Sequence, residues 1–117
     1  LILEKREGDK VKRLGVGWYR SGDAQEDWKT QEVDIKYARN GQAPDDVEEY
    51  ARYVLKYGHD GNTSATNPSE MPEATWGDIA TDKPTHILVV FTSSYQGDYF
   101  IGAPGSKLIV DNFELIY

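Results

Sequence analysis

The chain has 117 residues, of which 38% are hydrophobic and 12% aromatic, and this composition excludes a disordered or low-complexity protein. The formal net charge of −7 argues against a nucleic-acid or anionic-membrane partner, because both require a basic surface. The absence of cysteine excludes disulfides and thiolate chemistry, and no apolar run approaches the length of a transmembrane segment.

The length predicts a single domain over residues 1–117. The chain opens "LILEKREGDK", without an initiator methionine and already inside a predicted strand. We therefore expect it to be the C-terminal portion of a larger domain whose first strands are missing.

The first third of the chain predicts β-strands. Segments 1–6 and 11–20 flank Gly8-Asp9, a typical hairpin turn. In the second segment alternate residues are apolar, which indicates a strand with one buried face. Segment 27–37 alternates again and predicts a further strand, whose inward residues are Val33, Ile35 and Tyr37.

After residue 43 the spacing of the apolar residues changes from the two-residue period of a strand to the period of an α-helix. Apolar residues at 47, 50, 51, 54 and 55 form one stripe on a helical face. Pro44 suits the first turn of a helix, and Gly58 can end it. We predict one inserted α-helix over about residues 44–57.

The second half combines a long loop with two strands. Residues 58–84 read as a loop, and such length in a compact domain indicates a function, an insertion or internal contacts. Segment 85–94 is the most apolar run and predicts a central strand, and an aromatic and glycine-rich loop leads from it to a closing strand. In the closing strand the alternating apolar residues lie at even positions before Asp111-Asn112 and at odd positions after it. This shift predicts a β-bulge or a sharp bend. The result is about five antiparallel strands and one helix, roughly half of a β-sandwich.

Motifs for catalytic or metal sites are weak. Asp60, Asn62 and Ser64 follow calcium-loop spacing, but Ala65 and Met71 stand where that loop requires glycine and glutamate. Two histidines and no cysteine argue against zinc. A glycoside hydrolase needs two carboxylates across a cleft, and among twenty acidic residues the sequence singles out no pair.

Aromatic residues at strand ends and in loops offer a different chemistry. Flat aromatic faces beside polar groups suit sugar rings, although large aromatics also close the ends of sandwich cores. For Trp18 and Trp28 we favour the core, because they adjoin alternating strands. For Trp76, Tyr95 and Tyr99 binding and packing stay equally open.

The last third of the chain, from Lys83 to Tyr117, carries a specific pattern. It runs as a K-P-T-H-I strand, a Ser-Ser turn, a G-D-Y-F-x-G loop and then G-S-x-L-x-V-D-[DN]-x-E-L-I. This stretch resembles the C-terminal signature of the putative carbohydrate-metabolism domain family, PCMD, of gut-bacterial surface proteins. The matching residues are Lys83, Pro84, Thr85, His86, Ile87, Ser93, Ser94, Gly97, Asp98, Tyr99, Phe100, Gly102, Gly105, Ser106, Leu108, Val110, Asp111, Asn112, Glu114, Leu115 and Ile116.

The resemblance implies a mainly β fold, an antiparallel β-sandwich or jelly roll like galactose-binding and carbohydrate-binding modules. It also implies an exported protein of the outer-membrane surface or periplasm, often lipid-anchored, with an upstream domain in the same polypeptide. In modules with similar endings an Asp of the last strand helps to hold a structural calcium. By this similarity Asp111 is the candidate ligand, and no other cofactor is predicted.

The leading hypothesis is a non-catalytic glycan-binding module that captures oligo- or polysaccharide. The candidate contacts are Trp76, Tyr95, Asp98 and Tyr99, with Trp18 and Trp28 as further ones. The alternatives are a glycoside hydrolase with paired carboxylates and a structural or adhesive domain.

Overall fold

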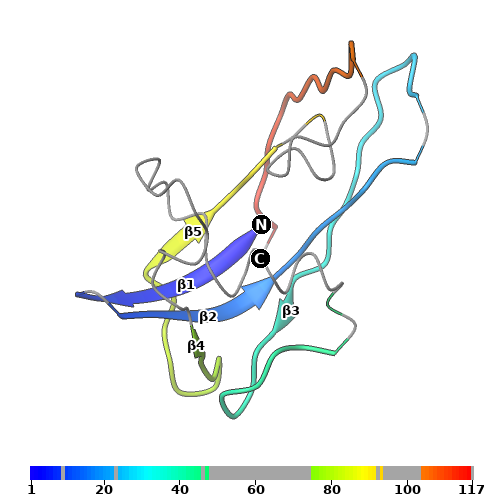
Figure 1. Ribbon diagram of the computed structural model, residues 1–117. Coiled ribbons are helices and arrows are strands. Elements are labelled where there is room, and N and C mark those ends of the chain that lie inside the picture. Colours follow the sequence, from blue (N-terminus) through cyan, green and yellow to red (C-terminus); the bar gives the residue numbers. More distant parts are fainter. Residues whose placement is uncertain are drawn as a thin grey trace.

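A computed structural model describes residues 1–8, 10–22, 24–45, 47, 75–91, 93 and 104–116. The described residues form one sheet built around a hairpin of β1 (Ile2–Glu7) and β2 (Lys10–Val16), which pair antiparallel (Figure 1). Gly8 in the connecting turn has a φ of 59°, a left-handed conformation that glycine adopts without steric cost. The predicted hairpin around Gly8 is confirmed.

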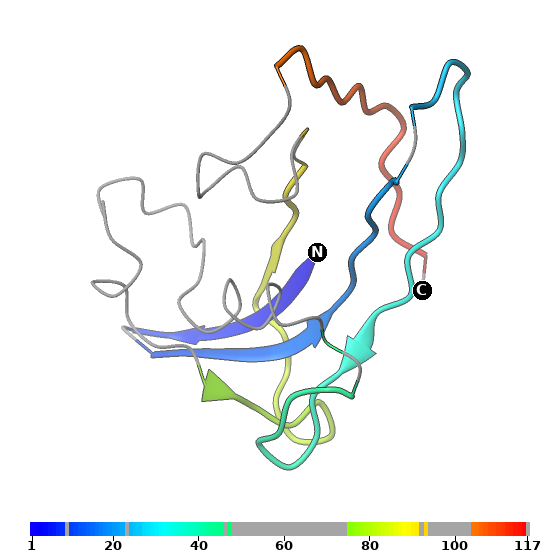
Figure 2. The ribbon, with the colours of Figure 1, turned by 45° about the vertical axis from the view of Figure 1, so that its right-hand side comes forward.

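Three short strands flank this hairpin. On one side β5 (His86–Leu88) pairs antiparallel with β1. On the other side β3 (Lys36–Tyr37) pairs antiparallel with the end of β2, and β4 (Thr75–Trp76) pairs parallel with its middle. The order is β3-β2-β1-β5, so β3 and β4 share one edge of β2 (Figures 1 and 2).

The pairing of β1 with β2 contains a β-bulge, in which β2 has one residue more than β1. The pairing decides which charged and apolar side chains share a face of the sheet. Leu3 pairs with Gly15 and Glu4 with Arg13, so Leu14 lies between these pairs without a partner on β1. Directly paired residues point to the same face, and residues two apart on one strand share a face. Ile2 and Glu4 therefore share a face with their partners on β2, while Lys5 and its partner Lys12 lie on the other.

The core lies on the face that carries Ile2. Ile2, Val16 and Val47 are buried together, and Trp18, Trp76 and Leu88 pack against them. Val47 belongs to the predicted helix over 44–57, most of which lies outside the described residues. Within the described part of the chain there is no helix, hence none that could span a membrane.

The predicted strand over 27–37 is wrong for most of its length, because only Lys36–Tyr37 joins the sheet. Two of its three expected inward residues, Val33 and Tyr37, are 40% and 44% exposed. An alternating pattern supplies one apolar face, but a strand also needs a neighbour whose backbone groups are free to pair.

The predicted central strand over 85–94 is shorter than expected in the described residues. Of residues 85–91 and 93, only His86–Leu88 forms a strand, and this strand, β5, ends the order of the described sheet. Val90 and Phe91 are each 53% exposed. The high apolar content of this run therefore does not reflect burial on both faces.

The predicted closing strand is absent from the described residues 104–116, whose apolar side chains are largely exposed. At Asp111-Asn112 the described backbone shows neither the ladder that a bulge would need nor a bend. Asn112 has a φ of 52°, and the Asp111 Oδ1 accepts the Asn112 backbone N–H at 2.8 Å. Asn tolerates this left-handed conformation better than most residues.

The prediction of a mainly β, largely antiparallel protein is confirmed for the described residues. The parallel pairing of β4 was not predicted, because residues 58–84 were interpreted as a loop. The described strands belong to a single sheet, so the sandwich or jelly roll stays a prediction.

Candidate functional site: an aromatic arm beside a charged sheet

Residues 17–22 and 24–35, between β2 and β3, form an arm that extends beyond the sheet (Figures 1 and 2). Its two legs meet closely at Gly17, where an added Cβ would lie 3.0 Å from the carbonyl oxygen of Asp34 and 3.0 Å from Cγ1 of Val33. The Gly17 backbone N–H also donates to the carbonyl of Leu1 at 3.0 Å. The base of the arm is therefore fixed on the sheet.

Two lysine–aromatic contacts bridge this part of the chain. The Lys29 Nζ lies 5.8 Å from the ring centroid of Tyr19, on the opposite leg of the arm. The Lys36 Nζ, from β3, lies 5.6 Å from the ring of Trp18. Both distances suit a cation–π interaction, which holds the two legs together without a ladder of backbone hydrogen bonds.

The arm presents the most exposed tryptophan of the described residues. Trp28 is 73% exposed, and Tyr19 and Tyr37 are 49% and 44% exposed. The interpretation of Trp28 as a core residue is therefore wrong. Exposed aromatic faces surrounded by polar groups can stack on the C–H faces of a sugar ring.

The same arm carries four exposed carboxylates. They belong to Glu26 and Asp27, just before Trp28, and to Glu32 and Asp34 on the returning leg. Within the described part of the chain none of the four forms an ion pair. Such carboxylates can accept hydrogen bonds from sugar hydroxyls.

The other predicted contact residues have different positions. Trp18 and Trp76 are half-buried, and both pack against the core of Ile2, Val16 and Val47. Trp28 is not part of that cluster, so the structure brings Trp18 and Trp76 to one core and leaves Trp28 on the surface. The predicted contacts Tyr95, Asp98 and Tyr99 lie outside the described residues.

The predicted calcium ligand, Asp111, is exposed, and its Oδ1 accepts the backbone N–H of the next residue. No group of three or more acidic or histidine side chains among the described residues could hold a metal ion. The structural calcium at Asp111 stays a prediction.

The sheet itself carries a buried ion pair, between Glu4 and Arg13, that the sequence analysis did not identify. Glu4 and Arg13, which pair across β1 and β2, are 0% and 2% exposed, and Arg13 Nη1 contacts Glu4 Oε1. The other carboxylate oxygen of Glu4 accepts the Arg6 Nε–H at 2.7 Å. Two guanidinium groups thus compensate the charge of one buried carboxylate.

The opposite face holds a second charged cluster, around Asp82. Lys5 Nζ donates to Asp82 Oδ1 at 2.9 Å, and Lys12 Nζ lies 3.5 Å from Asp82 Oδ2. The hydrogen bond from Lys5 lowers the pKa of Asp82, and the Asp78 backbone N–H lowers it further. The same hydrogen bond, with one to Glu7, raises the pKa of Lys5.

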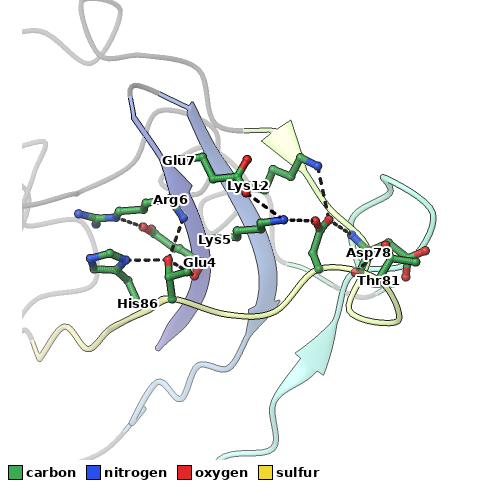
Figure 3. A network of polar contacts seen from close by, with 10 residues as sticks. Glu4, Lys5, Arg6, Glu7, Lys12, Asp78, Thr81 and His86 are labelled. Carbon is green, nitrogen blue, oxygen red and sulfur yellow. Dashed lines mark hydrogen bonds and ion pairs between the residues drawn. The ribbon is translucent and has the colours of Figure 1, made fainter.

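Thr85 joins β1 to β5 through contacts with Arg6 and His86, which are labelled in Figure 3. Its Oγ1 accepts the Arg6 backbone N–H at 2.9 Å and lies 2.8 Å from Nδ1 of His86. Its backbone N–H donates to the carbonyl of Glu4 at 2.8 Å. The hydroxyl and the backbone N–H of Thr85 thus have partners within the protein. Since these contacts connect β1 to the start of β5, they stabilise the sheet.

Comparison with known proteins identifies a family over nearly the whole chain. The family model of the putative carbohydrate metabolism domain, PCMD, matches residues 10–116. This match extends the resemblance of the last third to β2, the arm and the short strands, and it begins after β1. No curated protein and no solved structure matches the chain.

Proposed function

The chain belongs to the family of the putative carbohydrate metabolism domain, and we propose that it is a non-catalytic glycan-binding module whose aromatic arm contacts the sugar. The observation that carries this proposal is Trp28, 73% exposed on an arm that two lysine–aromatic contacts hold in place. Sugar rings stack on Trp28 and Tyr19, and the neighbouring carboxylates accept hydrogen bonds from hydroxyl groups.

The module belongs, in this proposal, to an exported bacterial surface protein that captures polysaccharide. Tyr95, Asp98 and Tyr99 are proposed as further contacts on the strength of the sequence alone. Affinity for a single site is weak, because exposed sugar hydroxyls exchange one set of hydrogen bonds, to water, for another.

The electrostatics of the sheet favour binding over hydrolysis. A glycoside hydrolase needs a carboxyl group with a raised pKa as its general acid. The carboxylate of Asp82 has a lowered pKa because Lys5 donates a hydrogen bond to it. Glu4, the most buried carboxylate described, contacts two arginines inside the sheet.

The test is the replacement of Trp28. Wild type, Trp28→Ala and Trp28→Phe are titrated against plant, mucin and microbial polysaccharides by isothermal calorimetry. We expect Trp28→Ala to weaken binding at least about tenfold, which corresponds to about 1.4 kcal/mol, whereas Trp28→Phe retains most of the affinity. Phe91→Ala is the control, since Phe91 is exposed but lies outside the arm.

Three results would contradict the proposal in different ways. If no polysaccharide binds the wild type, glycan binding itself is wrong. If Trp28→Ala binds as well as wild type, the arm is not the site. If the wild type releases reducing ends and one carboxylate substitution abolishes that release, the protein is a hydrolase.

A further inference from the structure

The described residues of the arm carry more negative than positive side chains: four carboxylates, from Glu26, Asp27, Glu32 and Asp34, against the two cations Arg20 and Lys29. Glu26 and Asp27 precede Trp28 directly, so their Cα atoms lie within about 7 and 4 Å of its own. Both side chains are exposed, and neither forms an ion pair with a described residue. The nearest lysine in the sequence, Lys29, has its ammonium group over the ring of Tyr19.

The returning leg adds charge of the same sign. Glu32 and Asp34 are exposed and likewise form no ion pair within the described residues. The chain as a whole has a net charge of −7, so no distant excess of positive charge offsets the arm. A ligand that reaches Trp28 therefore approaches a negative surface.

We infer that the arm selects uncharged glycans and discriminates against polyanionic ones such as uronate-rich, sulfated or sialylated chains. This inference rests on the proposed function, because it concerns the same site. An uncharged sugar meets carboxylates as hydrogen-bond acceptors for its hydroxyls. A sugar carboxylate or sulfate meets the same groups as like charges.

Coulomb's law sets the size of the effect. One exposed carboxylate about 8 Å from an anionic sugar group in water reduces its binding roughly two- to threefold. Two carboxylates, Glu26 and Asp27, reduce it about fivefold at low salt. The effect disappears near 1 M salt, where the screening length falls to about 3 Å.

The experiment compares each neutral polysaccharide that binds with a carboxymethylated derivative of the same backbone. For cellulose, the matched pair is hydroxyethyl cellulose and carboxymethyl cellulose. We expect the wild type to bind the anionic derivative about fivefold more weakly at low salt, and the difference to close in 1 M NaCl. In the double variant Glu26→Gln, Asp27→Asn the difference should narrow at low salt, and the part that remains is due to Glu32 and Asp34.

A second double variant separates local from overall charge. Asp45→Asn, Glu114→Gln changes the net charge by the same two units at exposed positions outside the arm. It should leave the discrimination unchanged. Equal or tighter binding of the anionic derivatives by the wild type, or equal effects of the two double variants, would overturn this inference alone. Failure of every polysaccharide to bind would overturn the proposed function with it.

Discussion

The carboxylate of Asp82 offsets the repulsion between two lysines that face each other on adjacent strands. Lys5 and Lys12 stand directly opposite each other on β1 and β2, where like charges destabilise a sheet. The carboxylate of Asp82, 9% exposed, contacts both ammonium groups. Its own position is held by a turn, because its backbone N–H donates to the carbonyl of Asp78 at 2.7 Å.

This arrangement predicts a loss of stability in acid. The pKa of Asp82 is lowered in the folded state, so its contribution is complete above the ordinary value of 3.8 and is lost as the pH falls through the lowered pKa. Urea unfolding at about pH 7, 4, 3 and 2 should therefore show a smaller decline for Asp82→Asn than for wild type. Parallel declines of the two proteins would contradict the assignment.

Gly77 gives a second prediction at the level of one residue. An added Cβ would lie 2.6 Å from Leu14 Cδ2 and 2.9 Å from Asp82 Oδ2, so Gly77→Ala should destabilise the fold by about 1–3 kcal/mol. Gly22→Ala is the matched control, because nothing lies within 4 Å of its added Cβ. Chemical unfolding of both variants measures the difference, and equal stabilities would show that the packing around Gly77 can relax.

At the level of elements, local signals were predictable and long-range pairings were not. The hairpin could be predicted because Gly8 and two alternating segments are adjacent in sequence. The strand β4 could not, since its two residues pair with Lys12 and Arg13, some sixty positions away. The period of 27–37 predicted a buried strand, but period alone cannot show whether a neighbouring strand exists, so Trp28 was expected in the core.

In the candidate site, too, local features could be predicted and contacts between distant residues could not. Aromatic residues with an affinity for sugars could be selected from their chemistry, and one of them, Trp28, is indeed exposed. The burial of Trp76 against the core depends on β4 and could not be read from a polar loop. The charged cluster was missed because Lys5, Lys12 and Asp82 meet only in the folded sheet.

The junction of β1 and β5 gives a prediction at this scale. Thr85→Val removes the hydroxyl that accepts the Arg6 backbone N–H, while it keeps the size and shape of the side chain. We expect a loss of about 0.5–1.5 kcal/mol in the free energy of unfolding and faster amide exchange at Arg6. Thr30→Val, at an exposed position in the arm, is the control. Unchanged exchange at Arg6 would show that this hydrogen bond does not hold the strands together.

At the level of the whole molecule, the backbone pairing of the described residues is concentrated in the hairpin. β1 is paired on both edges, and β2 pairs with β1, β3 and β4. In contrast, residues 104–116 belong to no ladder within the described part of the chain, and Ile109 and Ile116 are 73% and 78% exposed. The sequence of this segment favours a strand, but strand propensity is expressed only where a pairing edge is available.

Amide hydrogen exchange can distinguish the two descriptions of this segment. We expect strong protection in residues 2–7 and 11–16 and exchange close to the unprotected rate in 107–116, because local stability follows paired backbone groups. Protection of alternate amides in 107–116 would instead support the closing strand that the sequence predicts. A mass-spectrometric measurement on overlapping peptides is sufficient.

The edge of β2 that β3 and β4 share has a consequence for where the chain can accept insertions and deletions. The Gly41 backbone N–H donates to the carbonyl of Gly77 at 3.1 Å, and Ile79 donates to Ala38 at 3.0 Å, so the chain departs from the sheet and returns to it at adjacent points. Loop-closure entropy grows slowly with chain length, so doubling the length of a connection between two adjacent anchor points costs only about 0.6 kcal/mol of folding free energy. Insertions and deletions between Val47 and Thr75 should thus accumulate among relatives without disturbing the strand register, which makes this interval a natural place to graft a reporter or an additional recognition loop.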